Sequence, residues 1–329
     1  MSPDRVRILM NRFGALGHPF VWGVDFELEH AFFIEDTADT ADILWQVGSS
    51  GNAMALDIPD AMPDLRVVSP PAREEYAEAF GVVASGLARG DSFLTNLTTR
   101  TLTECDAGLE ELFHCCEAKY KLCLKDRFVC FSPEPFVRMR DGVISAFPMK
   151  GTADASKPGA EARLLSDYKE LCEHHTIVDL LRNDLNMVAL DVRVERFRYL
   201  ERINTARGAI LQTSSEISGK LPSDWQMHVG DILFAMLPAG SICGAPKPST
   251  LGIIREAEKL RRGWYTGVFG YFDGESMDCG VAIRCLSRDA GLLWFHSGGG
   301  ITVNSDEEEE YREVLDKVYL PLKNKCHAD

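Results

Sequence analysis

The stretch TGVFGYFDGESMDCGVAIRCLSRDAGLLWFH, residues 266–296, carries the clearest fold signal in the chain. Its apolar runs at 266–272, 278–286 and 292–296 predict three strands, because short runs of apolar and β-branched residues between turn-forming residues are typical of strands. Asp, Gly and Ser separate the runs and predict tight turns between them. The stretch therefore predicts strands that pair with their neighbours along the chain.

Apolar patterns predict further strands and helices in the rest of the chain. Strand-like runs occur at 92–102 and 127–144, and helical patterns occur at 70–90, 106–120, 160–184, 223–237, 249–262 and 305–322. The first 70 residues alternate short apolar runs with Gly, Asp and Pro, which favours further strands. No fixed-period repeat or low-complexity linker divides the chain. The sequence predicts a single domain over 1–329, with an N-terminal β-rich layer at 1–72 and a core at 73–325.

Charge and cysteine content limit the possible partners and the compartment. Lys and Arg number 35 against 50 Asp and Glu, which gives a formal net charge of −15. That charge opposes binding to nucleic acid or to an anionic membrane, although a few local cations can still hold a small anion. The ten cysteines form no C-x-x-C pair, and neither a signal peptide nor a membrane-spanning apolar run is present in the sequence. We therefore expect a cytoplasmic protein with reduced thiols.

Lys150 is the first candidate for a reactive group. It lies in AFPMKGTA (146–153), between an apolar run and Gly151. Partial desolvation lowers the pKa of a lysine and can make its neutral amine a nucleophile. The alternative is an ordinary lysine at a strand end, whose ammonium reaches water.

Two helical segments each carry a pair of glutamates on one face. Glu170 and Glu173 are three residues apart, as are Glu310 and Glu313, so each pair shares a helix face. Four carboxylates from two helices would suit Mg²⁺, a hard cation that prefers oxygen ligands. The alternative is that both are ordinary solvated acidic faces.

Two glycine-rich segments are candidates for binding an anion through backbone amides. GSICGAPKPS (240–249) opens a helical pattern but does not fit the P-loop spacing, because Gly244 is followed by Ala-Pro-Lys-Pro. It could still bind a carboxylate at the helix start. Gly298–Gly300 could do the same, or could only form a turn.

Seven segments together resemble the chorismate-utilising enzymes. They follow in order between residues 74 and 322, and they are SPEPF (132–136), PMKGT (148–152), EHHTIVDLLRND (173–184), GSICGAPK (240–247), RGWYTGVFGY (262–271), DCGVAIR (278–284) and GGGITVNSDEEEEYREVLDKV (298–318). The resemblance implies an α+β fold: a single large catalytic, chorismate-binding domain of mixed, mainly antiparallel sheets packed with helices. Within the family, the chain is most similar to the aminodeoxychorismate synthase component I branch of para-aminobenzoate and folate synthesis, because Lys150 stands where anthranilate synthases usually carry Ala.

The resemblance also implies catalytic and metal-binding roles. Lys150 matches the lysine that adds to C2 of the chorismate ring as the 4-hydroxyl leaves, before ammonia attacks C4. Glu134 matches the general acid and base. Glu173 and Glu313 match the Mg²⁺ ligands, with Glu170 and Glu310 acting through water.

Substrate-binding roles and partners follow from the same resemblance. Tyr265 and Arg284 match the pair that holds the enolpyruvyl carboxylate, and Lys317 would reach the ring carboxylate. Backbone amides of Gly298, Gly299 and the loop around Ser241 would complete the substrate contacts. No G-x-C-x-G nucleophile turn surrounds any cysteine, so we expect ammonia to come from a separate glutamine amidotransferase subunit.

The sequence leaves alternative functions open, and it departs from the family pattern at some positions. Anthranilate synthase component I shares the substrate and the metal but eliminates pyruvate, and Lys150 argues against it. Water-adding relatives use a lysine in the strand that here reads SFLTNLTTR, where Leu94 stands instead. A pyridoxal phosphate enzyme and a non-catalytic binding subunit explain the glutamates less well. Gln212 replaces a common His, and Cys243 replaces a common Thr or Ser.

Overall fold

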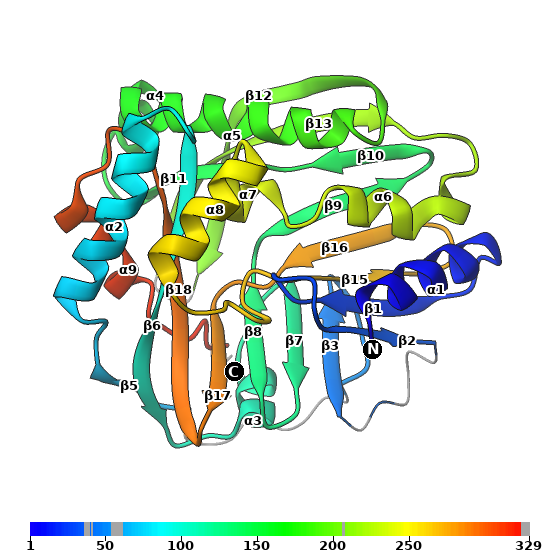
Figure 1. The fold of residues 1–329 in the computed structure, drawn as a ribbon, viewed down its shortest axis with the longest axis horizontal. Coiled ribbons are helices and arrows are strands. Elements are labelled where there is room, and N and C mark those ends of the chain that lie inside the picture. Colours follow the sequence, from blue (N-terminus) through cyan, green and yellow to red (C-terminus); the bar gives the residue numbers. More distant parts are fainter. Residues whose placement is uncertain (36–39, 41, 54–61, 206–207, 324–329) are drawn as a thin grey trace.

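The fold consists of two antiparallel β-sheets whose strands cross at a steep angle, with helices around them (Figure 1). The computed structural model describes residues 1–35, 40, 42–53, 62–205 and 208–323. Within this part of the chain, every pair of neighbouring strands is antiparallel, and no helix is long and apolar enough to cross a membrane. The structure confirms the predicted α+β class with mixed, mainly antiparallel sheets.

The first sheet runs across the upper part of Figure 1. In sheet order its strands are β11 (Met149–Asp154), β13 (Gly208–Lys220), β10 (Val143–Ala146), β9 (Pro135–Arg140), β16 (Met277–Val281), β15 (Val268–Phe272), β1 (Phe20–Val24) and β2 (Ala31–Ile34), and β12 (Leu190–Thr205) pairs with β13. The hairpin of β12 and β13 lies outside the elements that the sequence predicts.

The second sheet runs down the lower part of Figure 1. In sheet order its strands are β14 (Gly244–Ala245), β6 (Leu94–Cys105), β18 (Leu292–Ile301), β17 (Cys285–Asp289), β8 (Phe128–Ser132), β7 (Tyr120–Leu124), β3 (Ile43–Val47) and β4 (Ser50–Gly51), and β5 (Leu65–Ser69) pairs with β6. The stretch 266–296 therefore supplies both sheets: β15 and β16 pair in the first, and β17 and β18 pair in the second.

The helices lie where the sequence predicts them, apart from a short helix at 240–243 in the predicted loop and one addition at the N-terminus. They are α1 (Pro3–Ala15), α2 (Arg73–Ala88), α3 (Leu109–Cys115), α4 (Ala160–Ser166), α5 (Tyr168–Asn186), the 3₁₀ turn η1 (Trp225–His228), α6 (Val229–Ala235), α7 (Gly240–Cys243), α8 (Lys247–Glu258) and α9 (Glu307–Asp316). The addition is α1, which begins with Pro3 in its first turn and buries Val6 and Met10, four residues apart on one face. The N-terminal 72 residues thus contain a helix, and their strands join both sheets.

The two sheets meet through one tight contact. Gly280 on β16 faces the ring of Tyr120 on β7 so closely that a Cβ at this glycine would lie 2.4 Å from the ring. The Tyr120 hydroxyl donates to Asp278 Oδ1 at 2.6 Å, and Arg138 and Lys119 lie within 4 Å of the same carboxylate. Burial raises the pKa of Asp278, against the effect of Tyr120 and Arg138. A buried apolar cluster that includes Val21, Trp45 and Phe269 surrounds this contact.

The largest apolar cluster lies between the first sheet and the helices α1, α5 and α6. Helices α2 and α8 pack on β6 beside α9, around a smaller cluster that includes Tyr76, Leu97 and Ile253. Helices α5 and α9 thus bring their acidic faces to the region where β11 of one sheet approaches β6 and β18 of the other (Figure 1).

The contact between the sheets generates a prediction about stability. Gly280→Ala should lower the free energy of unfolding by about 1–3 kcal/mol, because an added methyl group in a packed core displaces its neighbours. Gly81→Ala is the matched control. Gly81 is exposed in α2 with open space around its Cβ position, so alanine there should raise stability by about 0.5–1 kcal/mol. Urea unfolding measures both variants, and equal stability of the two would contradict the role of the Tyr120 contact.

Candidate active site

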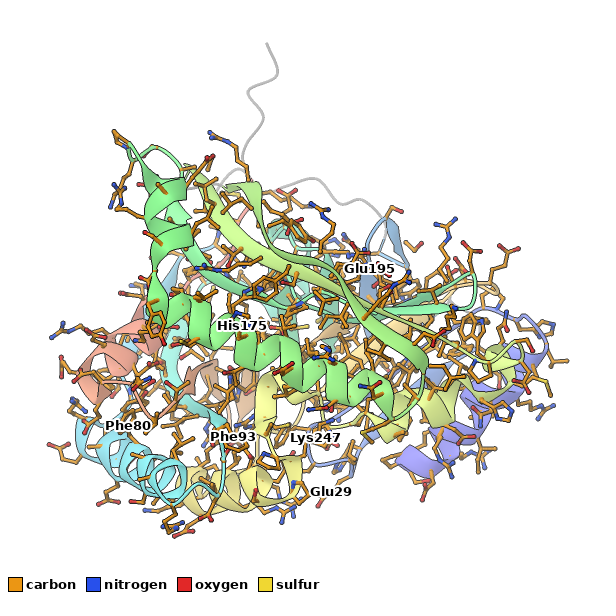
Figure 2. All side chains as sticks on the ribbon, turned by 90° about the horizontal axis from the view of Figure 1, so that it is seen from above. Glu29, Phe80, Phe93, His175, Glu195 and Lys247 are labelled. Atoms are coloured by element: carbon orange, nitrogen blue, oxygen red, sulfur yellow. The ribbon has the colours of Figure 1, made fainter. Side chains whose placement is uncertain are left out.

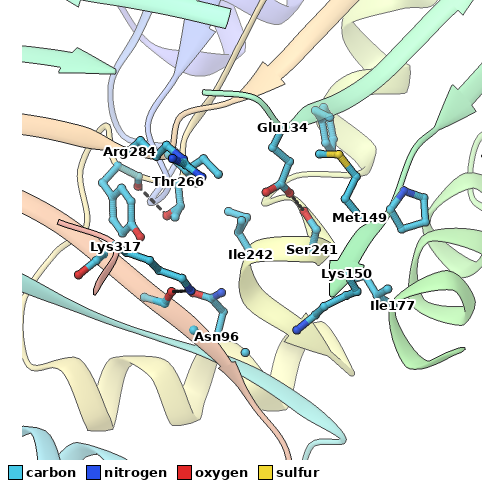
Figure 3. Close-up of a pocket in the computed structure, with 18 of the residues that line it drawn as sticks. Asn96, Glu134, Met149, Lys150, Ile177, Ser241, Ile242, Thr266, Arg284 and Lys317 are labelled. Atoms are coloured by element: carbon cyan, nitrogen blue, oxygen red, sulfur yellow. Dashed lines mark hydrogen bonds between the residues drawn. The ribbon is translucent and has the colours of Figure 1, made fainter. Parts of the chain in front are cut away.

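A cavity of about 230 Å³ opens where the two sheets and helices α5, α7 and α9 converge (Figure 3). Its lining includes these predicted site residues: Glu134, Lys150, Ser241, Tyr265, Arg284, Gly298, Gly299, Glu313 and Lys317. They come from seven separate segments of the chain, so only the tertiary fold assembles them. In Figure 3, Arg284 and Lys317 lie on one side of the space, and Glu134, Ser241 and Lys150 lie on the other.

Glu134 lies in the turn between β8 and β9. Its backbone N–H donates to Ser132 Oγ at 3.1 Å, and its carboxylate Oε1 accepts a hydrogen bond from Ser241 Oγ at 2.7 Å. Burial raises the pKa of Glu134, although the Ser241 hydroxyl and the ammonium groups of Lys150 and Lys317 counteract the rise. A buried carboxyl with a raised pKa that borders a cavity is suited to accept and donate protons.

Lys150 projects from β11 toward α5. Its Nζ lies 2.9 Å from Glu173 Oε2. Burial opposes the positive charge, but the carboxylates of Glu173, Glu313 and Glu170 outweigh burial and raise the pKa of Lys150. The expectation of a lowered pKa and a neutral amine is therefore wrong for this state of the protein, because a strand-end pattern does not reveal which carboxylates face the lysine.

Three of the four glutamates, Glu170, Glu173 and Glu313, lie near Lys150. Glu170 Oε2 lies so near Gly151 that a Cβ there would come within 2.9 Å, and Gly151 has a φ of +74°, which favours glycine. Burial and the neighbouring Glu173 raise the pKa of Glu170. Burial likewise raises the pKa of Glu310, which is also affected by Glu313. The two acidic faces are thus not ordinary solvated surfaces.

The glutamates do not form a compact ligand set in this structure. Among the described residues, no three His, Cys, Asp or Glu groups lie close enough together to hold one metal ion. Two of the glutamates pair with lysine ammonium groups instead of a metal ion. Lys150 pairs with Glu173, and Lys317 Nζ lies 2.7 Å from Glu313 Oε1. Burial opposes ionisation of Glu313, but Lys317 more than offsets this and lowers its pKa.

Arg284 is a partly buried cation without a carboxylate partner in the described part of the chain. Its guanidinium lies 4.7 Å from the centroid of the Tyr319 ring, and burial lowers its pKa. Most buried arginines are ion-paired, so an unpaired one facing a cavity marks a site for an anionic ligand. The side chain of Tyr265 is also buried beside the cavity, where its ring packs against His296 with centroids 5.0 Å apart.

Gly298 and Gly299 lie near the end of β18, beside the cavity. β17 pairs with β18 only as far as His296, whereas β6 pairs with it from 293 to 301. One edge of 297–301 therefore borders the cavity. Lys317 Nζ donates to the Gly298 carbonyl at 2.6 Å, which engages this carbonyl and holds the lysine across the strand.

The 240–249 loop uses its polar side chains within the protein. The Ser241 hydroxyl donates to Glu134, which leaves the loop backbone for the predicted contact with substrate. Lys247 does not line the cavity, and its ammonium binds the Asp184 carboxylate and the Met236 carbonyl. The Cys243 thiol is buried and donates to the Ala239 carbonyl at 3.2 Å, and Gln212 lies on β13 opposite Thr152.

The sequence analysis missed two polar residues of the cavity. Asn96 Oδ1 and Ser297 Oγ are buried and have no hydrogen-bond partner in the described residues. Asn96 follows Leu94 by two positions on β6, so both side chains point to the same face of the strand. That alternation is the signal that could have identified Asn96. No comparable signal marks Ser297.

Comparisons with known proteins show the family that the chain is similar to. The family model for chorismate binding enzyme matches residues 34–323. An uncharacterized PabA-like protein of Haemophilus influenzae is 47% identical over 315 residues, which cover 95% of each chain. Aminodeoxychorismate synthase component 1 of Escherichia coli is 35% identical over 268 residues, which cover 76% of this chain and 57% of that protein. The menaquinone-specific isochorismate synthase of Escherichia coli has the same fold, with a TM-score of 0.73 at 16% identity over 96% of this chain and 81% of its own.

The unpaired guanidinium generates a prediction about binding. Arg284→Gln should raise the Kd for the dicarboxylate chorismate roughly 10- to 100-fold, because hydrogen bonds to charged groups contribute about 1.5–3 kcal/mol. Arg288→Gln, an exposed arginine on neighbouring β17, should leave the Kd unchanged. Isothermal titration calorimetry measures both values. An unaltered Kd in the Arg284 variant would show that the anion binds elsewhere.

Proposed function

The chain belongs to the chorismate binding enzyme family, and we propose that within it the chain forms 4-amino-4-deoxychorismate from chorismate and ammonia. The observation that carries the proposal is the position of Lys150, which lines the same cavity as Glu134 and lies on the same side of it. Similarity to aminodeoxychorismate synthase component 1 of Escherichia coli supports it.

Chorismate carries two carboxylates, and two cations that line the cavity, Arg284 and Lys317, could each bind one of them. Arg284 would hold the enolpyruvyl carboxylate with help from Tyr265, since a guanidinium presents two parallel donors to a carboxylate. Lys317 is anchored by Glu313 and the Gly298 carbonyl, within reach of the ring carboxylate. These cations explain how a chain with a net charge of −15 takes an anionic substrate.

In the proposed reaction, Lys150 is the nucleophile and Glu134 donates and accepts protons. The Lys150 amine forms a bond to C2 of the ring, the ring double bond shifts, and the 4-hydroxyl leaves as water with a proton from Glu134. Ammonia then forms a bond to C4, the double bond returns, and the bond between C2 and Lys150 breaks. Glu134 receives the extra proton of the incoming ammonia, so chorismate and ammonia yield the amino product and water. Lys150 must lose a proton before the first step, although its neighbouring carboxylates favour its protonated form.

The glutamates fit a magnesium ion by their chemistry. All four present oxygen donors, and their mutual repulsion contributes to the raised pKa values of Glu170 and Glu310. Glu173 and Glu313 would bind Mg²⁺ directly, and Glu170 and Glu310 would bind it through water. Bound there, the ion supplies positive charge for the ring carboxylate. Glu173 would then share its charge with the metal and favour the ammonium form of Lys150 less strongly.

Competing reactions are disfavoured by two residues. Leu94 stands where water-adding relatives carry a lysine, and its side chain is buried against the cavity, so this position supplies no base for water. Anthranilate synthase remains the alternative function, and the lysine at position 150 disfavours it. Ammonia would come from a glutamine amidotransferase subunit, and a cytoplasmic location stays a prediction.

The first experiment identifies the product. The purified chain with chorismate, Mg²⁺ and ammonium should form 4-amino-4-deoxychorismate, detected by mass spectrometry, and omission of Mg²⁺ should abolish turnover. The rate should rise with pH through about 8–9, because only neutral NH₃ attacks carbon. Glutamine alone should give no product, which serves as the control. Anthranilate as the product would establish the alternative function, and consumption of glutamine by the single chain would contradict the two-subunit prediction.

The second experiment tests the nucleophile. Lys150→Ala should lower kcat by about 100-fold or more while the Kd for chorismate changes little, since a nucleophile acts after binding. Lys157→Ala, an exposed lysine outside the cavity lining, is the matched control and should retain full activity. Undiminished turnover of the Lys150 variant at saturating ammonium would contradict the covalent role and indicate direct attack by ammonia.

A further inference from the structure

Asp184 and Lys247 form a buried ion pair that the proposed function does not use. Asp184 lies near the end of α5 in the segment LLRND, and Lys247 opens α8 in the segment GAPK. Lys247 Nζ lies 2.9 Å from Asp184 Oδ1 and also donates to the Met236 carbonyl at 2.7 Å. The two side chains are only 9% and 19% exposed. Burying the two charges costs desolvation energy, so stability alone does not explain the pair. This favours a role in positioning neighbouring residues.

The pair lies directly against the first residue of α7. Gly240 packs so tightly on α5 that a Cβ there would lie 2.5 Å from Asp184 Oδ2 and 2.1 Å from the Leu180 side chain. Burial raises the pKa of Asp184, whereas Lys247 favours its charged form. Asp184 therefore packs closely against the start of α7, and Lys247 holds its carboxylate there.

The next residue in α7 is Ser241, whose hydroxyl binds Glu134. The other end of α7 is fixed by Arg262, a buried residue whose Nη1 donates to the Ile242 carbonyl at 2.8 Å. The short helix is thus held at both ends, and the Ser241 hydroxyl projects from it toward the cavity (Figure 3). Figure 2 shows Lys247 on the side of α5 away from His175, next to the α7–α8 segment.

We propose that the Asp184–Lys247 pair is a positioning device for the acid and base of the reaction, acting on Glu134 through Gly240 and Ser241. Neither residue lines the cavity, so neither touches the substrate. The pair fixes where the Ser241 hydroxyl stands, and that hydroxyl fixes the orientation and proton affinity of the Glu134 carboxyl. The proposal rests on the proposed function only in assigning the proton transfers to Glu134.

The test is a double-mutant cycle between Asp184→Asn and Ser241→Ala. Asp184→Asn alone should lower kcat by about 10- to 100-fold with little change in KM, because small displacements of catalytic groups have effects of this size. In the double variant the loss should equal that of Ser241→Ala alone, since both changes act through one hydroxyl. Losses that multiply would overturn the proposal, because the two residues would then act independently.

A second readout follows the Glu134 carboxyl itself. The groups that act on it are Ser241, the ammonium groups of Lys150 and Lys317, and the nearby Tyr265 hydroxyl. Loss of the Ser241 hydrogen bond removes a contact that stabilises the carboxylate, so the pKa of Glu134 should rise in both single variants. ¹³C NMR of glutamate-labelled protein measures this shift without substrate. An unchanged titration in Asp184→Asn would overturn the proposal even if activity fell.

The controls separate positioning from stability and from the identity of the reaction. Asp231→Asn removes the partner of Arg7 in a half-exposed pair between α1 and α6, and it should leave kcat and the Glu134 titration unchanged. Lys247→Met replaces Asp184→Asn if the latter does not fold, and the same non-additivity with Ser241→Ala is expected. Activity is scored as chorismate consumed, whatever the product, so formation of anthranilate would contradict the proposed function without affecting this test. If no chorismate is consumed, the NMR titration still decides the positioning role.

Discussion

Charge balance inside one partly buried cavity is the constraint on which the rest of the site depends. Glu170 and Glu173 of α5 and Glu313 of α9 lie near the Lys150 ammonium of β11, and Glu313 also pairs with Lys317 at the end of α9. Buried carboxylates without nearby cations would take up protons. Lys150 therefore links the acidic faces of the two helices, and the neighbouring carboxylates set how easily Lys150 changes its charge.

The backbone around the cavity and between the sheets is closely packed at three glycines. Gly151 admits the Glu170 carboxylate, Gly240 admits Asp184, and Gly280 admits the Tyr120 ring between the sheets. Each is a close approach that any larger side chain would obstruct. The catalytic groups thus stand on a strand, on helices and on a short turn whose backbones are packed at contact distance, which is the arrangement that pre-organises a site.

The fold itself does not select the reaction. The isochorismate synthase of Escherichia coli shares the fold at only 16% identity. One fold can support different reactions, so function must be argued from the side chains of the site. In this chain those side chains include Lys150 and Leu94, together with Asn96 and Ser297, whose buried polar atoms have no protein partner within the described residues. The unpaired atoms offer hydrogen bonds that a substrate can complete.

The sequence alone indicated many of the strands and most of the helices, because apolar periodicity and turn residues are local properties of the chain, but it did not indicate the β12–β13 hairpin. It also identified nine of the residues that line the cavity, since seven ordered segments carry the family resemblance, and i, i+3 spacing places each glutamate pair on one face. Helix α1 was detectable from Pro3 and the spacing of Val6 and Met10, but was not predicted.

Only the tertiary structure decided how the side chains are used. Lys150 is held as an ammonium by Glu173, 23 residues away; Ser241 donates to Glu134, 107 residues away; and Lys247 turns from the cavity to Asp184. A pKa or a hydrogen-bond partner depends on distances between atoms that are remote in the sequence. No local pattern encodes those distances, so they became known only when the two sheets and the helices were packed together.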